Sequence, residues 1–258
     1  MNNIHPTAIV SGKARLGNNI TISPYAVIHD DVEINDGCSI GPHAVLYDGA
    51  RLGSNVRIFQ CSSIAHVPQD LKFKGEPTRF IIGDNTTIHE FVTLHRGTLE
   101  TGFSSIGRNC LLMAYSHVAH DSTIGDNCII ANGVQLAGHV EIEDFVIIGG
   151  MTPVHQFCKV GQHAMIGGAF RVVKDVPPFV LAGYEPLKYA GLNIVGLRRR
   201  GFSSDDIHSL KQAYTYIYNS GLNFSQAGLK VEEELGANPR VRVVLDFLGR
   251  SKRGIIGK

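Results

Sequence analysis

Aliphatic residues recur at every sixth position along the first two thirds of the chain. Up to the first interruption these residues are Ile4, Val10, Leu16, Ile22, Ile28, Ile34, Ile40, Leu46, Leu52, Ile58 and Ile64. This spacing matches neither the period of a helix nor the two-residue alternation of a strand. It is typical of a left-handed parallel β-helix built from hexapeptides, in which three short strands form one triangular coil and the coils stack as solenoid repeats.

The pattern is interrupted twice and then resumes in phase. It stops after Ile64 and returns at Ile82, stops again after Leu94, and runs without a break from Ile106 to Val172. We predict two loops that project from the β-helix, at about residues 66–80 and 99–105, and we expect the first to use one coil's worth of sequence. Long polar loops of this kind often carry function.

Beyond residue 180 the six-residue pattern gives way to helical spacing. Residues 203–206 offer a serine N-cap and an acidic first turn, and apolar residues then follow helical spacing as far as Tyr218. Further helices are predicted from about Ser225 to Leu235 and from Pro239 onwards. The fold is therefore predicted to be mainly β: a left-handed β-helix over residues 1–180 and an α-helical C-terminal domain over residues 181–258.

Composition and charge exclude some classes of function and favour one cellular location. The 258 residues carry a formal net charge of +1, which gives no reason to expect nucleic acid as a partner. No basic N-terminal leader and no apolar run near the ~20 residues of a membrane span is evident, so we expect a cytoplasmic protein. Four of the five cysteines fill positions that elsewhere hold small apolar residues, and we interpret them as buried, inert thiols.

Coil stacking brings polar residues together across the sequence. Residues 18 apart lie above one another, separated by about one strand spacing of ~4.8 Å. His120 therefore stacks under Gly138 and Gln156, and Asp121 stacks under His139. We interpret this column and its polar neighbours as an active site.

Histidine is the side chain best suited to exchange a proton near neutral pH. His117, His120, His139 and His155 lie within two or three coils of one another. One interpretation is acyl transfer, with His120 as general base, Asp121 as its support, and the Gly138 N–H as donor to an oxyanion. No serine or cysteine nucleophile is evident beside His120, so direct attack on a thioester is favoured over an acyl-enzyme.

Two other interpretations stay open. Three imidazoles in a trimeric β-helix could bind zinc as in a carbonic-anhydrase-type hydratase, although such a site gives no role to the first loop or to the arginines. A non-enzymatic scaffold or ice-binding surface would require regular threonine-rich faces, and none is present. The basic run Arg198-Arg199-Arg200, together with Lys72 and Lys74, could hold a diphosphate or an acidic carrier protein.

Several motifs closely resemble those of the UDP-N-acetylglucosamine O-acyltransferases, the family that begins lipid A synthesis. The resemblance covers nearly the whole chain, and its motifs are Gln69-Asp70-Leu71-Lys72, Gly75-Glu76-Pro77-Thr78-Arg79, Leu94-His95-Arg96-Gly97-Thr98, His117-Val118-Ala119-His120-Asp121, Leu136-Ala137-Gly138-His139, Val154-His155-Gln156-Phe157 and Gly196-Leu197-Arg198-Arg199-Arg200-Gly201-Phe202. It implies a homotrimer of left-handed β-helices whose active sites lie in clefts between subunits, and we expect no cofactor and no metal. It also implies transfer of a (3R)-hydroxyacyl chain from acyl carrier protein to the 3-position of UDP-N-acetylglucosamine.

The resemblance also implies roles at matching positions. The catalytic group would be His120, Asp121 and Gly138. The residues implied in substrate binding are Gln69, Asp70, Lys72 and His139 around the sugar, His117, Asn193, Arg199 and Arg200 near the phosphates, and His155 with Gln156 near the nucleoside or acyl portion. Gly168 matches the position that limits acyl length, and a glycine there implies a longer chain.

The acceptor is a remaining alternative. Relatives that acylate a 3-amino sugar share these motifs, so the motifs do not separate an ester product from an amide. A related N-acyltransferase of the same pathway has an extra N-terminal domain, whereas the six-residue pattern here starts at Ile4, which favours the O-acyltransferase.

Overall fold

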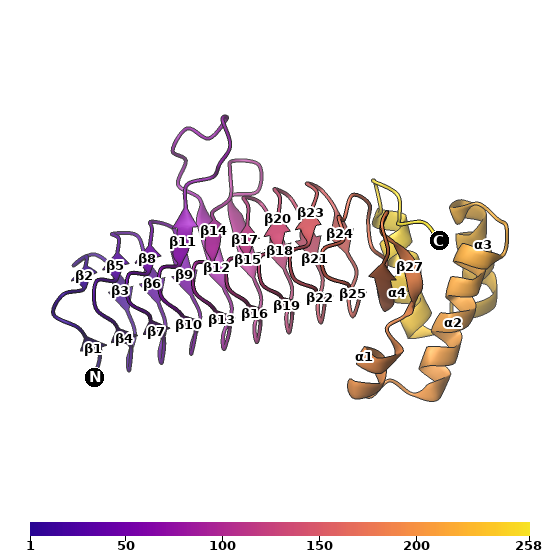
Figure 1. The fold of residues 1–258 in the computed structure, drawn as a ribbon, viewed down its shortest axis with the longest axis horizontal. Helices are drawn as coiled ribbons and strands as arrows, with labels where there is room; N and C mark the ends of the chain where they lie inside the picture. The colour runs from indigo at the N-terminus through magenta and orange to yellow at the C-terminus, as the bar shows by residue number, and fades with distance from the viewer.

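The computed structural model describes all 258 residues, and its dominant feature is a three-sided prism of stacked coils (Figure 1). The coils form the left-handed parallel β-helix that the six-residue spacing predicts. The first sheet contains β1 (Asn3–Ile4), β4 (Thr21–Ile22), β7 (Ser39–Ile40), β10 (Arg57–Ile58), β13 (Thr87–Ile88), β16 (Leu111–Leu112), β19 (Ile129–Ile130), β22 (Ile147–Ile148), β25 (Met165–Ile166), β26 (Val180–Gly183) and β27 (Lys188–Leu192).

The other two sheets complete the prism. The second sheet contains β2 (Ile9–Val10), β5 (Val27–Ile28), β8 (Val45–Leu46), β11 (Ser63–His66), β14 (Thr93–His95), β17 (His117–Val118), β20 (Gln135–Leu136) and β23 (Pro153–Val154). The third contains β3 (Arg15–Leu16), β6 (Glu33–Ile34), β9 (Ala50–Leu52), β12 (Arg79–Ile82), β15 (Phe103–Ile106), β18 (Thr123–Ile124), β21 (Glu141–Ile142) and β24 (Lys159–Val160).

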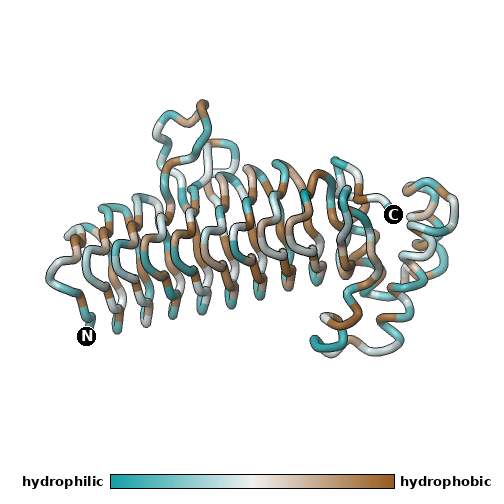
Figure 2. Tube along the Cα trace, in the orientation of Figure 1, coloured by the Kyte–Doolittle hydropathy of each residue, from teal (hydrophilic) through white to brown (hydrophobic).

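The strand register follows the spacing of the aliphatic residues. Ile124 pairs with Ile142, one coil later, and both side chains are buried inside the prism. Repeated pairing of this kind builds continuous ladders of Ile, Leu and Val, whose burial is the main driving force for folding. Figure 2 shows the resulting alternation of hydrophobic and hydrophilic segments along each coil.

Every coil turns through corners whose backbone enters the left-handed region. Asn19, Asp121 and His139 have φ values of 56°, 57° and 59°. Asparagine tolerates this conformation well, and most other residues adopt it at a cost. The backbone turn at these corners sets the direction in which the side chains of Asp121 and His139 point.

The two predicted loops are present, but the first is shorter than expected. Across it, Ile58 pairs with Ile88, five hexapeptides later instead of three, so the loop adds two hexapeptides to the coil and not a full coil of three. Across the second loop, Leu94 pairs with Val118, four hexapeptides later, so this loop adds one. Each insertion is a whole number of hexapeptides, and the inward-facing positions therefore stay in phase.

The C-terminal part begins as an extension of the sheet and continues as helices. Strand β26 pairs with β25 in parallel, and β27 pairs with β26 in antiparallel orientation. In the segment predicted to be helical from residue 181, the first helix begins at Ile194. The helices are α1 (Ile194–Arg199), α2 (Ser204–Asn219), α3 (Phe224–Leu235) and α4 (Pro239–Arg250).

The helix-start signals in the sequence operate as predicted. Ser203 forms a capping box with Asp206 at the start of α2, and Pro239 occupies the first position of α4 after the Asn238 N-cap. The short helix α1 was missed.

None of the helices has the length and apolarity that crossing a lipid bilayer requires. Cys38, Cys110, Cys128 and Cys158 are buried as expected, and Cys61 is exposed.

Candidate active site

A cleft of about 790 Å³ lies where the two loops meet one edge of the prism. Its lining comes from both loops and from the corners of later coils. The lining residues are Gln69, Asp70, Leu71, Lys72, Phe73, Glu76, Thr98, Leu99, Glu100, His120, His139, Gln156 and Phe157. This mixture of acidic, basic and imidazole groups suits a polar ligand with several hydrogen-bonding groups.

His120 and Gly138 touch across neighbouring coils, as their spacing of one coil predicts. A Cβ atom added to Gly138 would lie 2.7 Å from Cε1 and 2.9 Å from Nε2 of His120. Because such distances are shorter than a van der Waals contact, only glycine lets the imidazole come this close to the backbone. The side chain of His120 keeps 17% of its surface exposed and borders the cleft.

The Gly138 N–H donates no hydrogen bond within the chain, although the residue is buried. At another edge of the prism, the equivalent N–H groups of Arg108 and Asp126 donate to aspartate side chains one coil later, at 2.7 and 2.8 Å. The residue one coil after Gly138 is Gln156, and it makes no such bond. An unpaired buried N–H is rare, and here it is a donor left free for a ligand.

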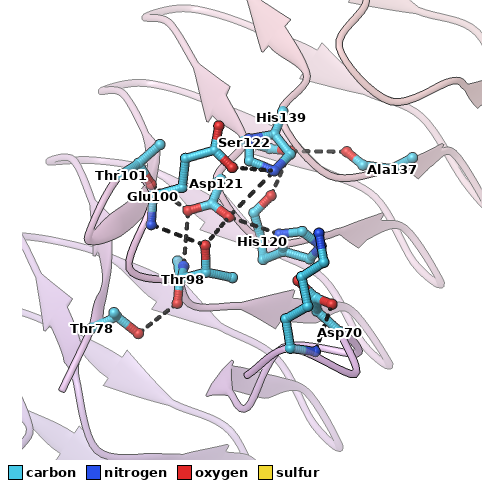
Figure 3. A network of polar contacts seen from close by, with 12 residues as sticks. Asp70, Thr78, Thr98, Glu100, Thr101, His120, Asp121, Ser122, Ala137 and His139 are labelled. Carbon is cyan, nitrogen blue, oxygen red and sulfur yellow. Dashed lines mark hydrogen bonds and ion pairs between the residues drawn. The ribbon is translucent and has the colours of Figure 1, made fainter. Parts of the chain in front are cut away.

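Asp121 lies beside His120, and its side chain has no exposed surface. Its Oδ2 accepts a hydrogen bond from Nδ1 of His120 at 2.8 Å, and further donors come from Thr98 and Thr101 (Figure 3). Burial raises the pKa of Asp121, but the hydrogen bonds from Thr101, His120 and Thr98 outweigh burial and hold this pKa below its usual range. Asp121 is therefore ionised at neutral pH.

The hydrogen bond to Asp121 fixes the tautomer of His120. Asp121 can only accept, so Nδ1 of His120 carries the hydrogen and Nε2 of the neutral ring is left as an acceptor. A histidine oriented in this way can remove a proton from a hydroxyl group in the cleft.

His139 forms the next layer of the cleft wall. Its ring stacks on Phe157 with centroids 4.6 Å apart and meets His120 edge to face at 5.3 Å. Its Nε2 lies 3.6 Å from carboxylate oxygens of both Asp121 and Glu100. Figure 3 shows Glu100 reaching towards His139 from the second loop.

The predicted site residues divide into two groups in the structure. Gln69, Asp70, Lys72, His139 and Gln156 share the cleft with His120, and Asp121 lies directly behind His120. The side chain of Asp70 also accepts from the Lys72 N–H at 3.0 Å, which shapes the loop that carries both residues.

The remaining predicted residues do not line the cleft of this chain. His117 bonds through Nδ1 to Thr93 at 2.7 Å, and His155 is exposed. Gly168 lies exposed at a prism corner, where an added Cβ would be 3.0 Å from the carbonyl oxygen of Gly150.

Asn193, Arg199 and Arg200 lie at helix α1, which Figure 1 draws well away from the two loops. Asn193 is the N-cap of α1 and also donates to the His163 carbonyl oxygen at 3.0 Å. The Arg200 guanidinium stacks on Phe145, 5.3 Å from the ring centroid. Arg199 is exposed.

Thr98, Thr101 and Glu100 were missed as candidate residues. The second interruption of the six-residue pattern predicted a loop but not its contacts, and the motif Leu94-His95-Arg96-Gly97-Thr98 included Thr98 without implying a role for it. Because the loop adds one hexapeptide at this corner, it folds back over the Asp121 carboxylate.

The site offers a poor set of ligands for a metal ion. Ligand atoms of His120, Asp121 and His139 lie within 4.8 Å of one another. However, each Asp121 oxygen already accepts two hydrogen bonds, and a carboxylate has about four lone-pair positions. A metal ion would have to displace these donors, which weighs against a zinc hydratase.

Comparisons with known proteins agree on one family. The family described as UDP N-acetylglucosamine O-acyltransferase, domain 2, matches residues 175–256, and the bacterial transferase hexapeptide family matches residues 13–48 and 103–138. A relative from Aliarcobacter butzleri is 52% identical over 256 residues, which is 99% of this chain and 98% of the relative. Its name describes an O-acyltransferase acting between acyl carrier protein and UDP-N-acetylglucosamine.

Solved structures extend the likeness to the whole fold. A UDP-N-acetylglucosamine acyltransferase from Bacteroides fragilis matches with a TM-score of 0.96 and 46% identity, covering 98% of this chain and 99% of its own. The enzyme of the same name from Arabidopsis matches with a TM-score of 0.83 and 33% identity, covering 99% of this chain and 100% of its own.

Buried histidines should make the protein less stable in acid. Burial, with smaller effects from nearby charges, lowers the pKa of His95 and of His163 to about 4. Unfolded histidine titrates near 6.5, so the unfolded state binds more protons as the pH falls below that value. The stability contributed by each neutral ring is present above about pH 6.5 and is lost as the pH falls towards 4.

We expect each ring to account for about 2 kcal/mol of lost unfolding free energy between pH 7 and pH 5. His163→Phe keeps the aromatic stack with Phe145 and Phe179 and should remove its share of the loss. Denaturant unfolding at the two pH values measures this, with the exposed His208→Phe as the matched control. Equal acid sensitivity in wild type and His163→Phe would contradict the prediction.

Proposed function

The chain belongs to the UDP-N-acetylglucosamine O-acyltransferase family, and we propose that it transfers an acyl chain from acyl carrier protein to the 3-hydroxyl of UDP-N-acetylglucosamine by direct, base-assisted attack. This is the first step of lipid A synthesis. The observation that supports the mechanism most strongly is the Asp121-bonded ring of His120, which lies against Gly138, a residue with a free N–H, and lines an open cleft.

In the proposed reaction, Nε2 of His120 removes the proton from the sugar hydroxyl. The oxygen attacks the thioester carbonyl, a carbon–oxygen bond forms, and the carbonyl oxygen becomes an oxyanion that accepts from the Gly138 N–H. When the carbon–sulfur bond breaks, the His120 imidazolium returns the proton to the departing thiolate. Asp121 stays ionised throughout and stabilises the imidazolium.

Polar residues of the cleft hold the acceptor in this proposal. Gln69, Asp70 and Lys72 from the first loop face His139 and Gln156 across the cleft. Hydroxyl and amide groups of a sugar are well matched by carboxylate, amide and imidazole side chains. Lys72 supplies the only fixed positive charge among the residues that line the cleft, so it can pair with a phosphate.

A homotrimer completes the site, because Asn193, Arg199 and Arg200 lie outside this chain's own cleft. The three sheets differ in a way that supports such an assembly. The outward face of the third sheet carries ion pairs such as Arg51 with Glu33, at 3.0 Å. The edge between the first and second sheets instead exposes large apolar residues, namely Tyr25, Phe91, Tyr115 and Met151.

Packing these apolar edges around a threefold axis would bury them and bring helix α1 of one copy towards the cleft of the next. Residues near α1 then contact the phosphates of the nucleotide sugar. We further infer a cytoplasmic location, where acyl carrier protein and nucleotide sugars are available.

The activity test uses purified protein with a panel of (3R)-hydroxyacyl carrier-protein donors and two acceptors, UDP-N-acetylglucosamine and its 3-amino analogue. We expect an ester product that hydroxylamine cleaves. An amide formed only with the amino analogue would overturn the choice of acceptor.

His120→Ala should lower turnover by about 10²-fold or more, which is the scale of losing a general base. The fold should be unaffected because the side chain borders the cleft and leaves the aliphatic ladders intact. Circular dichroism and sedimentation check the fold and assembly of the variant. Wild-type turnover in a folded His120→Ala protein would refute the proposed base.

Chain-length selection by Gly168 gives another prediction. Glycine places no side chain at this exposed corner, so we expect the wild-type enzyme to prefer a longer acyl chain. Gly168→Met adds a bulky side chain and should shift the preference towards shorter donors, measured as the ratio of kcat/KM across the donor panel. An unchanged ratio in a folded, active variant would show that another residue limits the chain.

A further inference from the structure

The second loop supplies most of the hydrogen bonds that Asp121 receives. Thr98 donates twice, from its N–H to Oδ1 and from its hydroxyl to Oδ2, both at 2.8 Å. The Thr101 hydroxyl lies within hydrogen-bond distance of Oδ1 and, at 2.8 Å, of the Phe103 carbonyl oxygen. Its single hydrogen goes to Oδ1, the charged and therefore stronger acceptor, and Nδ1 of His120 completes the set at Oδ2. Each carboxylate oxygen therefore accepts two hydrogen bonds, and the carboxylate can neither rotate nor shift without breaking one of them (Figure 3).

The loop that carries these donors is itself held in place. The Thr98 carbonyl oxygen accepts from the Gly102 N–H at 2.8 Å, which closes the loop. The Gly97 carbonyl oxygen accepts from the Thr78 hydroxyl at 2.6 Å, and a Cβ on Gly97 would lie 2.4 Å from the Phe103 nitrogen. The loop is thus packed against the backbone on both sides of Thr98.

All donors from the loop are neutral. A lysine or arginine at these positions would cancel the charge of Asp121, whereas hydroxyl and N–H groups orient the carboxylate and leave its charge intact. A full negative charge is what stabilises an imidazolium that develops during the reaction. The chemistry of the loop therefore matches the need of a histidine that gains and loses a proton in each turnover.

We infer that Thr98 and Thr101 are positioning residues, which hold the Asp121 carboxylate ionised and aimed at Nδ1 of His120. The inference rests on the proposed function, because it deepens the role of the same pair. Neither threonine needs to contact the reacting atoms. They act through Asp121, and the second loop is part of the catalytic apparatus.

Several other charged and titratable groups surround the pair and would titrate with it. The cleft contributes Asp70, Lys72 and Glu76 from the first loop, Glu100 from the second loop, and His139 from the next coil. His95 and His117, on β14 and β17, lie near enough to His120 for their charges to interact with it. A test must therefore separate His120 from these groups.

The test compares Thr101→Val, which replaces the hydroxyl with a methyl group and so loses its contacts with Asp121 and Phe103, with Thr101→Ser, which keeps the hydroxyl. Thr123→Val is the matched control, because Thr123 lies on the outer face of β18 and makes no side-chain hydrogen bond. Two quantities are measured against pH: the steady-state constants for acyl transfer, and the rate at which diethyl pyrocarbonate modifies His120, followed by peptide mass spectrometry. The second readout reports the protonation of His120 and does not depend on activity.

For Thr101→Val we expect kcat to fall about tenfold, on the scale of one hydrogen bond to a charged group, with KM within about twofold of wild type. Loss of a donor makes Asp121 more basic, and a more basic carboxylate holds the His120 proton more tightly. The acid limb of kcat/KM and the modification midpoint of His120 should both move to higher pH, by about one pH unit. Thr101→Ser and Thr123→Val should behave as wild type.

The inference is overturned if Thr101→Val leaves both pH midpoints unchanged, or if Thr101→Ser is impaired as much as Thr101→Val. A rise in KM alone would also overturn it, because that is the effect expected from a loop that only shapes the cleft. If wild-type protein transfers no acyl group, the proposed function fails, whereas the His120 modification profile still decides the role of Thr101.

Discussion

The stacking of coils at a fixed interval of three hexapeptides is the constraint on which this structure depends. Aliphatic ladders inside the prism enforce that interval, because a slip by one residue would move every inward side chain to the surface. The same interval controls the outside of the prism, where His120 meets Gly138 and Asp121 lies next to His139. Packing of the aliphatic core therefore determines how the polar residues on the outside of the prism lie relative to one another.

The site combines a buried carboxylate, that of Asp121, with a partly exposed imidazole ring, that of His120. Asp121 is buried and fully hydrogen-bonded, and His120 keeps part of its surface open to the cleft. A buried charge is costly unless its partners satisfy it, and here three of the four hydrogen bonds come from an inserted loop and one from His120 of the repeat. The regular repeat supplies His120 and Asp121, and the irregular insertion supplies most of the hydrogen bonds that hold the Asp121 carboxylate.

Much of the fold could be predicted because aliphatic residues recur at every sixth position of the sequence. The positions of Ile124 and Ile142, and hence of Asp121 and His139 near them, followed from counting in sixes, and the Ser203 and Pro239 signals located two helices. The contacts of Thr98 and Thr101 could not be predicted, because a loop outside the repeat has no register from which to count. Helix α1 was missed because it spans only Ile194–Arg199, too short for a helical pattern to emerge. The structure of a single chain leaves the predicted residues Asn193, Arg199 and Arg200 away from the cleft, and their part in the site belongs to the proposed trimer.

The most direct measurement is a crystal structure of the protein with UDP-N-acetylglucosamine bound. The account predicts the sugar 3-oxygen within about 3 Å of Nε2 of His120, with Nδ1 of the same ring still bonded to Asp121. A sugar bound with its 3-oxygen away from His120, or a His120 ring turned so that Nε2 faces Asp121, would contradict it.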